Sequence, residues 1–379
     1  MLKRFNLCTA FLVRIVATLW RRREFIRAFK QPTARINSRL HLSVCLAMSF
    51  CSVSYADSVT PNYQWGRGIN LFSGQLNIGG YANSSYTQLS GQKNSLTLED
   101  LSLFISASLS DSIRFFSEIE LEDALSTKHT SNFNASLRVE RLYLDYLATD
   151  EVTVRVGKWL TPFGRWNVVH AAPLVWTTTR PFITDELLFP AHSSGAMVSK
   201  KFNINEHNLD VSVYVDDSQH LDVRKDPINF QNAFGSRINL ELTEQLQIGF
   251  SFLDFKQVDV HEARNHLFGV DFFWQHSGYE MQMEASYRHN ASVQGDEKGL
   301  YIQGVAPLAK QVFAVSRYEY LEGAHQVNFT RLQSSTHAAL AGLVWRPFVP
   351  LAIKAEYRFG SENQAVAPSG FFTSVAVLF

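Results

Sequence analysis

Hydrophobic and polar residues alternate along most of the chain after residue 56. In LSLFISASL (101–109), apolar residues occupy every second position, and serines mostly fill the positions between them. The same alternation appears in IRFFSEIELE (113–122) and in LDVSVYVDD (209–217). A period of two predicts β-strands that have one apolar face and one polar face.

The number and length of these segments predict a barrel that crosses a membrane. About sixteen candidate strands follow one another, often of about 9–11 residues, the length that a tilted strand needs to cross a bilayer. Tight turns such as 242–245 and 276–278 alternate with longer polar connections, for which we take 126–136 and 321–336. We therefore expect an all-β fold, a transmembrane antiparallel up-and-down β-barrel of about 16 strands (14 to 18) with an inward-folded constriction loop. A soluble sandwich of two sheets is the alternative.

Composition argues against membrane-spanning helices. The mean hydropathy of the chain is −0.09, and no apolar run of about 20 residues follows residue 56. Strands can cross a bilayer only in a closed sheet, because an open edge leaves backbone groups unpaired in lipid. The last strand is therefore predicted to pair with the first.

The chain ends in SGFFTSVAVLF, with an apolar residue at most alternate positions. Phe371, Val375, Val377 and Phe379 share one face of the expected last strand, and Thr373 interrupts the series. This ending is similar to the C-terminal signature of Gram-negative outer-membrane barrels, which the barrel-assembly machinery reads. The resemblance implies that these four apolar residues form a membrane insertion signal and that the protein resides in the outer membrane of a Gram-negative bacterium.

The first 56 residues have a different composition from the rest. They contain ten Lys or Arg residues and one acidic residue, Glu24, and they end in the apolar stretch LHLSVCLAMSFCSVSYA (40–56). A basic flank, an apolar core and small residues at the end of the core, where cleavage would occur, predict a secretory signal peptide. Residues 1–56 are thus expected to be an N-terminal extension plus signal peptide, cleaved after Ala56, and residues 57–379 the barrel. An uncleaved signal anchor is the alternative.

Cleavage changes the expected chemistry of the chain. All three cysteines precede residue 57, so the mature chain has no disulfide, catalytic thiol or Cys-ligated metal, and we expect no metal and no cofactor. Removing ten of the 35 basic and one of the 35 acidic residues leaves 25 against 34, a net charge of about −9. This acidic balance argues against nucleic acid as a partner.

One stretch, residues 154–195, does not alternate. Four prolines rule out a continuous central strand, and six Phe or Trp residues argue against disorder. A long apolar insertion of this kind needs an interior to pack against. We predict that the loop at about 158–192 folds into the barrel and narrows it.

A family resemblance covers the same stretch. The run RVGKWLTPFGRWN (155–167) resembles the part of the phosphate-selective porin superfamily in which a strand leads through Pro-Phe-Gly into the constricting loop. Segments 141–146, 316–323, 342–347 and 353–360 look like strands of the same Gram-negative outer-membrane porins. The resemblance implies a porin barrel. Phosphate selectivity is not implied, because the loop has too few Lys and Arg residues for an anion funnel.

Charged residues of the loop and of the polar strand faces are the candidate site residues. For each of them, a structural ion pair inside the barrel is the alternative role. The expected constriction residues are Lys158, Arg165, His170, Arg180, Asp185 and Glu186, and the expected lumen-facing residues are Glu118, Glu120, Arg141, Arg155, Arg317 and Glu319.

These patterns favour a channel over an enzyme. The sequence has no G-x-S-x-G elbow and no HExxH motif, and the nearest His/Ser grouping is His192-Ser193-Ser194. We expect an outer-membrane porin that lets small polar or ionic solutes diffuse passively. Its expected partners are outer-membrane lipid and lipopolysaccharide, the barrel-assembly machinery, small solutes or ions and, as the resemblance suggests, further copies in a homotrimer. A plugged structural or adhesion barrel and, behind it, a barrel hydrolase are the alternatives.

Overall fold

The computed structural model describes most of the chain after residue 60. The described residues are 61–379 without 128–134, 170, 185–187, 206, 222–229, 258–263, 291–295, 328–329 and 361–366. The signal peptide predicted for residues 1–56 lies outside them. In the described part of the chain, no helix has the length and apolar character needed to cross a membrane.

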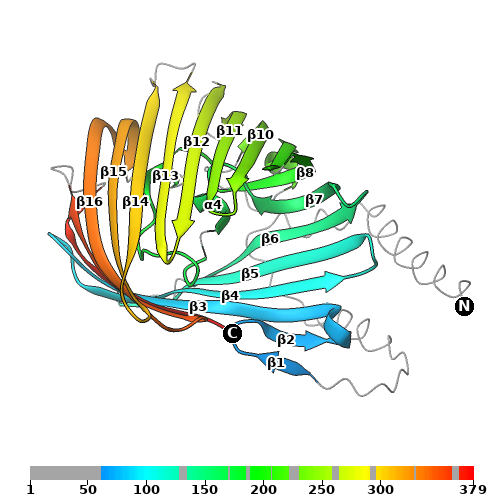
Figure 1. Ribbon diagram of the computed structural model, residues 1–379. Helices are drawn as coiled ribbons and strands as arrows, with labels where there is room; N and C mark the ends of the chain where they lie inside the picture. Colours follow the sequence, from blue (N-terminus) through cyan, green and yellow to red (C-terminus); the bar gives the residue numbers. More distant parts are fainter. Residues whose placement is uncertain are drawn as a thin grey trace, which may run out of the picture. The chain divides into compact units, whose positions relative to one another are not determined.

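Sixteen long strands form one antiparallel sheet (Figure 1). Each pairs with its neighbour in sequence, and β18 pairs with β3, so the sheet closes into a barrel. The strands are β3 (Leu76–Leu89), β4 (Ser95–Ser108), β5 (Ile113–Ser126), β6 (Ser136–Leu147), β7 (Val152–Leu160), β8 (His192–Ile204), β9 (His207–Asp216), β10 (Phe230–Thr243), β11 (Leu246–Gln257), β12 (Asn265–His276), β13 (Tyr279–Asn290), β14 (Glu297–Ala309), β15 (Val312–Val327), β16 (Thr330–Phe348), β17 (Leu351–Gly360) and β18 (Gly370–Leu378). The predicted fold class and strand number are confirmed.

A short hairpin precedes the barrel strands. It consists of β1 (Asn62–Gln64) and β2 (Gly68–Leu71), followed by the 3-10 turn η1 (Phe72–Gly74). β2 pairs with the first residues of β3, where Ile69 lies opposite Ile78. β18 pairs with the remainder of β3, from Tyr81 to Leu89.

The C-terminal residue lies against β3, as closure requires. Phe379 donates its backbone N–H to the carbonyl of Gly80 at 2.9 Å and accepts the N–H of Gly80 at 3.0 Å. Its ring lies over Gly80, where a Cβ atom would come within 2.9 Å of the ring. The chain end is therefore held by backbone pairing at the closing seam, as the sequence predicts.

Burial along the strands is the reverse of that in a soluble sandwich. On β17, the exposed residues are the aromatic Tyr357 and Phe359, with 42 % and 58 % of their surface accessible. The buried residues on the opposite face of this strand are charged, namely Lys354, Glu356 and Arg358, at 8 % or less. An apolar outer face and a charged inner face suit a barrel in lipid with a polar interior. The sandwich alternative is wrong.

One connection was predicted wrongly. Residues 321–336 were expected to form a long polar loop, but β15 continues to Val327 and β16 begins at Thr330. Their ladder runs out to the pair Val327 and Thr330. Strands that extend beyond the apolar band of a barrel need no apolar face, so their sequence resembles that of a loop.

Candidate functional site

The described residues of the segment between β7 and β8, which are 161–169, 171–184 and 188–191, lie inside the barrel (Figure 1). We call the segment 161–191 the inner segment. It contains the single-turn helix α4 (Trp166–Val169) and the 3-10 turn η2 (Phe182–Thr184). Its two ends are held together, because Thr161 donates its N–H to the carbonyl of Ala191 at 2.8 Å and the Asn167 amide donates to both of their carbonyls.

Apolar side chains of the inner segment pack against the barrel wall. Phe163 and Phe189 contact each other with ring centroids 4.8 Å apart, within a buried cluster that includes wall residues of β7 to β12 and β14 to β16. Glycines on the wall make room for them. A Cβ atom at Gly269 would lie 2.5 Å from the ring of Phe163, and one at Gly299 would lie 2.5 Å from Ile183.

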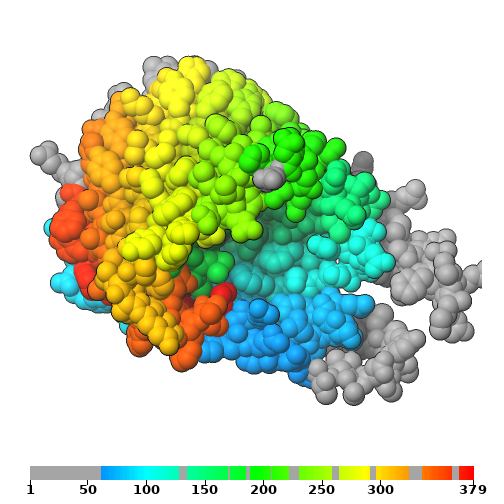
Figure 2. Space-filling model, in the orientation of Figure 1, coloured from blue at the N-terminus to red at the C-terminus, as the bar shows by residue number. Residues whose placement is uncertain are grey.

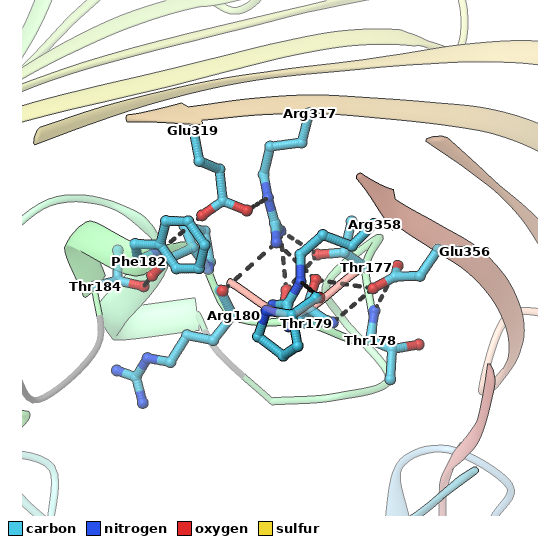
Figure 3. Close-up of polar contacts among 12 residues, drawn as sticks. Thr177, Thr178, Thr179, Arg180, Phe182, Thr184, Arg317, Glu319, Glu356 and Arg358 are labelled. Carbon is cyan, nitrogen blue, oxygen red and sulfur yellow. Dashed lines mark hydrogen bonds and ion pairs between the residues drawn. The ribbon is translucent and has the colours of Figure 1, made fainter. Parts of the chain in front are cut away.

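A buried arginine of β15 holds the middle of the inner segment (Figure 3). Arg317 donates to the hydroxyls of Thr177 and Thr179, both at 2.7 Å, and to the carbonyl of Thr179 at 2.9 Å. Its Nε also donates to Glu319 at 2.8 Å, and Glu319 accepts the backbone N–H of Phe182 at 2.7 Å. Both charged side chains are almost fully buried.

Two charged residues of β17 hold the same region from another direction. Glu356 accepts the backbone N–H groups of Thr178 and Thr179, at 3.0 and 2.9 Å, and the Thr179 hydroxyl at 2.8 Å (Figure 3). The Lys354 ammonium donates to the carbonyls of Ala172 and Thr177, at 2.7 and 3.1 Å. Buried charges of the wall thus satisfy backbone groups of a segment without regular structure.

The first turn of the inner segment contacts β11 to β13. Trp166 donates its backbone N–H to the Glu284 carboxylate at 2.7 Å, and the Arg165 guanidinium donates to the side-chain oxygen of Gln247 at 2.8 Å. The same guanidinium lies 3.6 Å from the centroid of the Phe273 ring. Burial at this place lowers the pKa of Arg165 from its ordinary value.

Replacing Thr179 tests this anchoring. In Thr179→Val, Glu356 loses a hydroxyl donor and Arg317 loses an acceptor, with almost no change of shape. Leaving such buried groups unpaired costs about 1–3 kcal/mol. We expect the free energy of unfolding in lipid vesicles to fall by that amount.

The control is Thr373→Val, which changes a half-buried threonine of β18 on the alternating face that carries Phe371 and Val375. Equal stability of the Thr179→Val variant and the unaltered protein would contradict the anchoring role.

A cavity of about 210 Å³ remains between the inner segment and the other side of the barrel. Figure 2 shows the molecule hollowed between the cyan strands and the yellow ones. Residues of β3 to β6, β17, β18, the start of β8 and the inner segment surround the cavity. Its charged lining residues are Glu99, Asp100, Glu120, Glu122, Arg138, Glu140, Arg180, His192 and Lys354.

Ion pairs follow the inner face of β5 to β7. Glu118 pairs with Arg141, and Arg155 donates two hydrogen bonds to Asp145, at 2.7 and 2.8 Å. Arg155 also lies over the ring of Tyr143, 3.7 Å from its centroid. These ion pairs agree with the alternative role named for the charged residues in the sequence analysis, a structural ion pair inside the barrel.

The structure separates the predicted constriction residues. Arg180 lies on the inner segment and lines the cavity, where it donates to Asn167 at 2.8 Å. Arg165 lies on the same segment but contacts the wall at Gln247, and Lys158 lies on β7 opposite Ser194. The remaining three, His170, Asp185 and Glu186, lie outside the described residues.

The predicted lumen-facing residues Glu118, Glu120, Arg317 and Glu319 are all buried, with at most 5 % of their surface accessible. The His192-Ser193-Ser194 grouping is built into the barrel wall. His192 Nε2 lies 2.5 Å from a carboxylate oxygen of Glu140. The hydroxyls of Ser193 and Thr161 form a hydrogen bond of 2.9 Å.

Sequence reasoning missed part of the acidic lining, and the structure shows why. Asn83 pairs with Asp100 and Ser84 with Leu98, so Glu99 is an extra residue in β4. Glu118 pairs with Arg141 and Ile119 with Val139, so Glu140 is an extra residue in β6. A β-bulge interrupts the period of two. Strict alternation therefore puts Glu99 and Asp100 on opposite faces, whereas both line the cavity.

Comparisons with known proteins agree with this architecture. No protein-family model matches the chain. An uncharacterized protein of Aquifex aeolicus is 24 % identical over 241 residues. The match covers 59 % of this chain and 54 % of that protein, so the chain spans about half the length of the relative that it matches.

Solved structures show the same fold. Salmonella typhi OmpF, solved with daunomycin, is similar with a TM-score of 0.59 and 10 % identity, over 82 % of this chain and 98 % of that one. An anion-selective porin from Comamonas acidovorans has a TM-score of 0.56 and 12 % identity, over 80 % and 99 %. A trimer form of OmpT, an outer-membrane protein of Vibrio cholerae, has a TM-score of 0.54 and 11 % identity, over 80 % and 99 %. The chain thus has the 16-stranded barrel fold of outer-membrane porins.

Proposed function

We propose that this protein is an outer-membrane porin, a water-filled channel through which small polar or ionic solutes diffuse passively. The inner segment, residues 161–191, narrows the channel. The barrel fold, its polar interior and the porins among its structural neighbours support this proposal.

The observation that carries the proposal is the arrangement of the inner segment. Buried charges of β13, β15 and β17 hold it on one side of the barrel, through Glu284, Arg317, Glu319, Lys354 and Glu356. On its other side, a cavity lined by charged residues remains. A barrel of 16 strands is wide enough to leave an aqueous channel, so a segment held against one wall reduces the passage and leaves part of it open.

The relation to the phosphate-selective porin superfamily stays a prediction from the run 155–167. The solved structures that match include an anion-selective porin and an OmpF, and they support a porin barrel in general. Localisation in the outer membrane of a Gram-negative bacterium and a homotrimeric assembly belong to the same proposal. One structural neighbour was solved in a trimer form.

Liposome swelling tests the proposal. Vesicles that contain the purified protein are diluted into isosmotic solutions of neutral sugars of increasing size. We expect swelling that is fast for the smallest sugars and slows steeply with size, because a narrowed passage sorts solutes by their cross-section. Vesicles that swell no faster than protein-free ones would favour the plugged structural barrel instead.

The C-terminal residue offers a separate prediction on assembly. If the final apolar residues act as an insertion signal, Phe379→Ala lowers severalfold the amount of folded barrel in the outer membrane. The control is Phe359→Ala, which changes an exposed aromatic residue of the neighbouring strand β17. Heat-modifiable mobility of the membrane fraction on detergent gels measures both. Equal amounts of the two variants would contradict an insertion signal at Phe379.

A further inference from the structure

The charges around the cavity are unevenly distributed. Five carboxylates line it, all from the three neighbouring strands β4, β5 and β6, and they are Glu99, Asp100, Glu120, Glu122 and Glu140. Three Lys or Arg residues line it too, namely Arg138 of β6, Arg180 of the inner segment and Lys354 of β17. Carboxylate oxygens of Glu120, Glu122 and Glu140 lie within 4.8 Å of one another. We call the five carboxylates the acidic wall.

Bulges concentrate this negative charge. Glu99 and Glu140 are the extra residues of β4 and β6, and both line the cavity. Asp100 lies directly opposite Glu122 on β5. Unbulged strands would place every second residue on the inner face and would bring fewer carboxylates to this place.

Several carboxylates of the acidic wall are hydrogen-bonded to neutral donors. Glu120 accepts from the hydroxyls of Tyr81 and Ser102, at 3.0 and 2.9 Å. Glu99 and Asp100 both accept from the amide of Asn83, at 2.9 and 3.2 Å. Such bonds orient the carboxyl groups toward the cavity lining.

Each of the three Lys or Arg residues of the lining has its own partners. One pairs with a single carboxylate of the acidic wall, and the other two donate hydrogen bonds to groups outside that wall. Arg138 pairs with Glu122 at 2.7 Å. The Lys354 ammonium donates to two carbonyls of the inner segment, and the Arg180 guanidinium donates to Asn167 and lies 5.0 Å from the centroid of the Trp166 ring. Acidic residues therefore outnumber Lys and Arg residues around the cavity, five to three.

We propose that the passage is cation-selective and that the acidic wall on β4 to β6 sets this preference. This inference rests on the proposed channel function and names the class of solute that the channel favours. A cleft with low-dielectric walls and charge of one sign focuses the field and raises the local concentration of counter-ions, about tenfold or more. Small cations therefore enter the narrow part of the passage more often than anions of equal size, and neutral solutes are sorted by size alone.

The test is the reversal potential of the full protein in a planar bilayer that separates concentrated from dilute KCl. We expect K⁺ to permeate severalfold better than Cl⁻. In the double variant Glu99→Gln, Glu140→Gln, the ratio should fall toward one, since the substitutions remove two carboxylates while the amide at position 99 keeps acceptors for Asn83 and Ser85. The matched control is Asp150→Asn, Glu244→Gln, which removes two exposed carboxylates from turns and should leave the ratio unchanged.

The outcomes separate this inference from the channel proposal. Currents with equal or greater permeability for Cl⁻, or a ratio that stays the same in the double variant, would overturn cation selection by the acidic wall and leave the channel intact. A protein that carries no current at all overturns both. The heat resistance of each variant on detergent gels shows whether its barrel is folded before the ratio is compared.

Discussion

Deletion of residues 165–185 should raise the single-channel conductance severalfold. The deleted part contains the contacts that place the inner segment across the barrel, from Trp166 with Glu284 to Phe182 with Glu319. Without it, the interior of a 16-stranded barrel is limited by the wall side chains alone, and its cross-section grows. Planar-bilayer recordings of the deletion variant and the unaltered protein measure the effect.

A deletion in a different connection controls for the loss of residues as such. Removing Gln92 and Lys93, which lie in the exposed connection between β3 and β4, should leave the conductance unchanged. The deletion of 165–185 also uncovers apolar wall residues such as Leu267 and Leu321, so its barrel should be less resistant to heat. A folded deletion variant with unaltered conductance would show that the inner segment does not limit the passage.

Replacement of Arg317 should have the largest effect of any single substitution considered. Arg317→Met removes the charge that pairs with Glu319 and the hydrogen bonds that Arg317 donates to Thr177 and Thr179. Leaving Glu319 buried without its partner costs about 3–5 kcal/mol. We expect the free energy of unfolding to fall by that amount and the open-channel current to become noisier, because the middle of the inner segment loses its main anchor.

A double variant distinguishes the unpaired charge from the lost anchor. In Arg317→Met, Glu319→Gln, no buried carboxylate remains unpaired, so part of the lost stability should return while the current stays noisy. Arg114→Met, which changes an exposed arginine of β5, is the control and should alter stability by about 0.5 kcal/mol or less. If Arg317→Met behaved like this control, the anchoring account would be wrong.

The barrel could be predicted from the sequence because its signals are local. A period of two in β9 or β17 is visible within ten residues, and closure follows from the requirement that no strand edge be left in lipid. The polar strand ends at 321–336 were missed, because outside an apolar band strands and loops have similar compositions.

The site was less predictable, because its contacts join distant parts of the chain. The prolines and aromatic residues of 154–195 indicated that the loop folds inward, but not where it docks. Thr179 and Glu356, for example, are 177 residues apart. The bulges at Glu99 and Glu140 depend on the register between strands, which the sequence does not show. A prediction based on strict alternation therefore missed two residues of the acidic wall, Glu99 and Glu140.

The central claim is that this barrel is an open, narrowed channel, and the single-channel current of the unaltered protein tests it most directly. Purified protein is added to a planar bilayer in symmetrical KCl at constant voltage. We predict discrete upward current steps of uniform size that stay open for long periods and scale linearly with voltage. A membrane whose current stays at the bare-lipid level, although folded barrels have inserted, would contradict the claim and point to a plugged barrel.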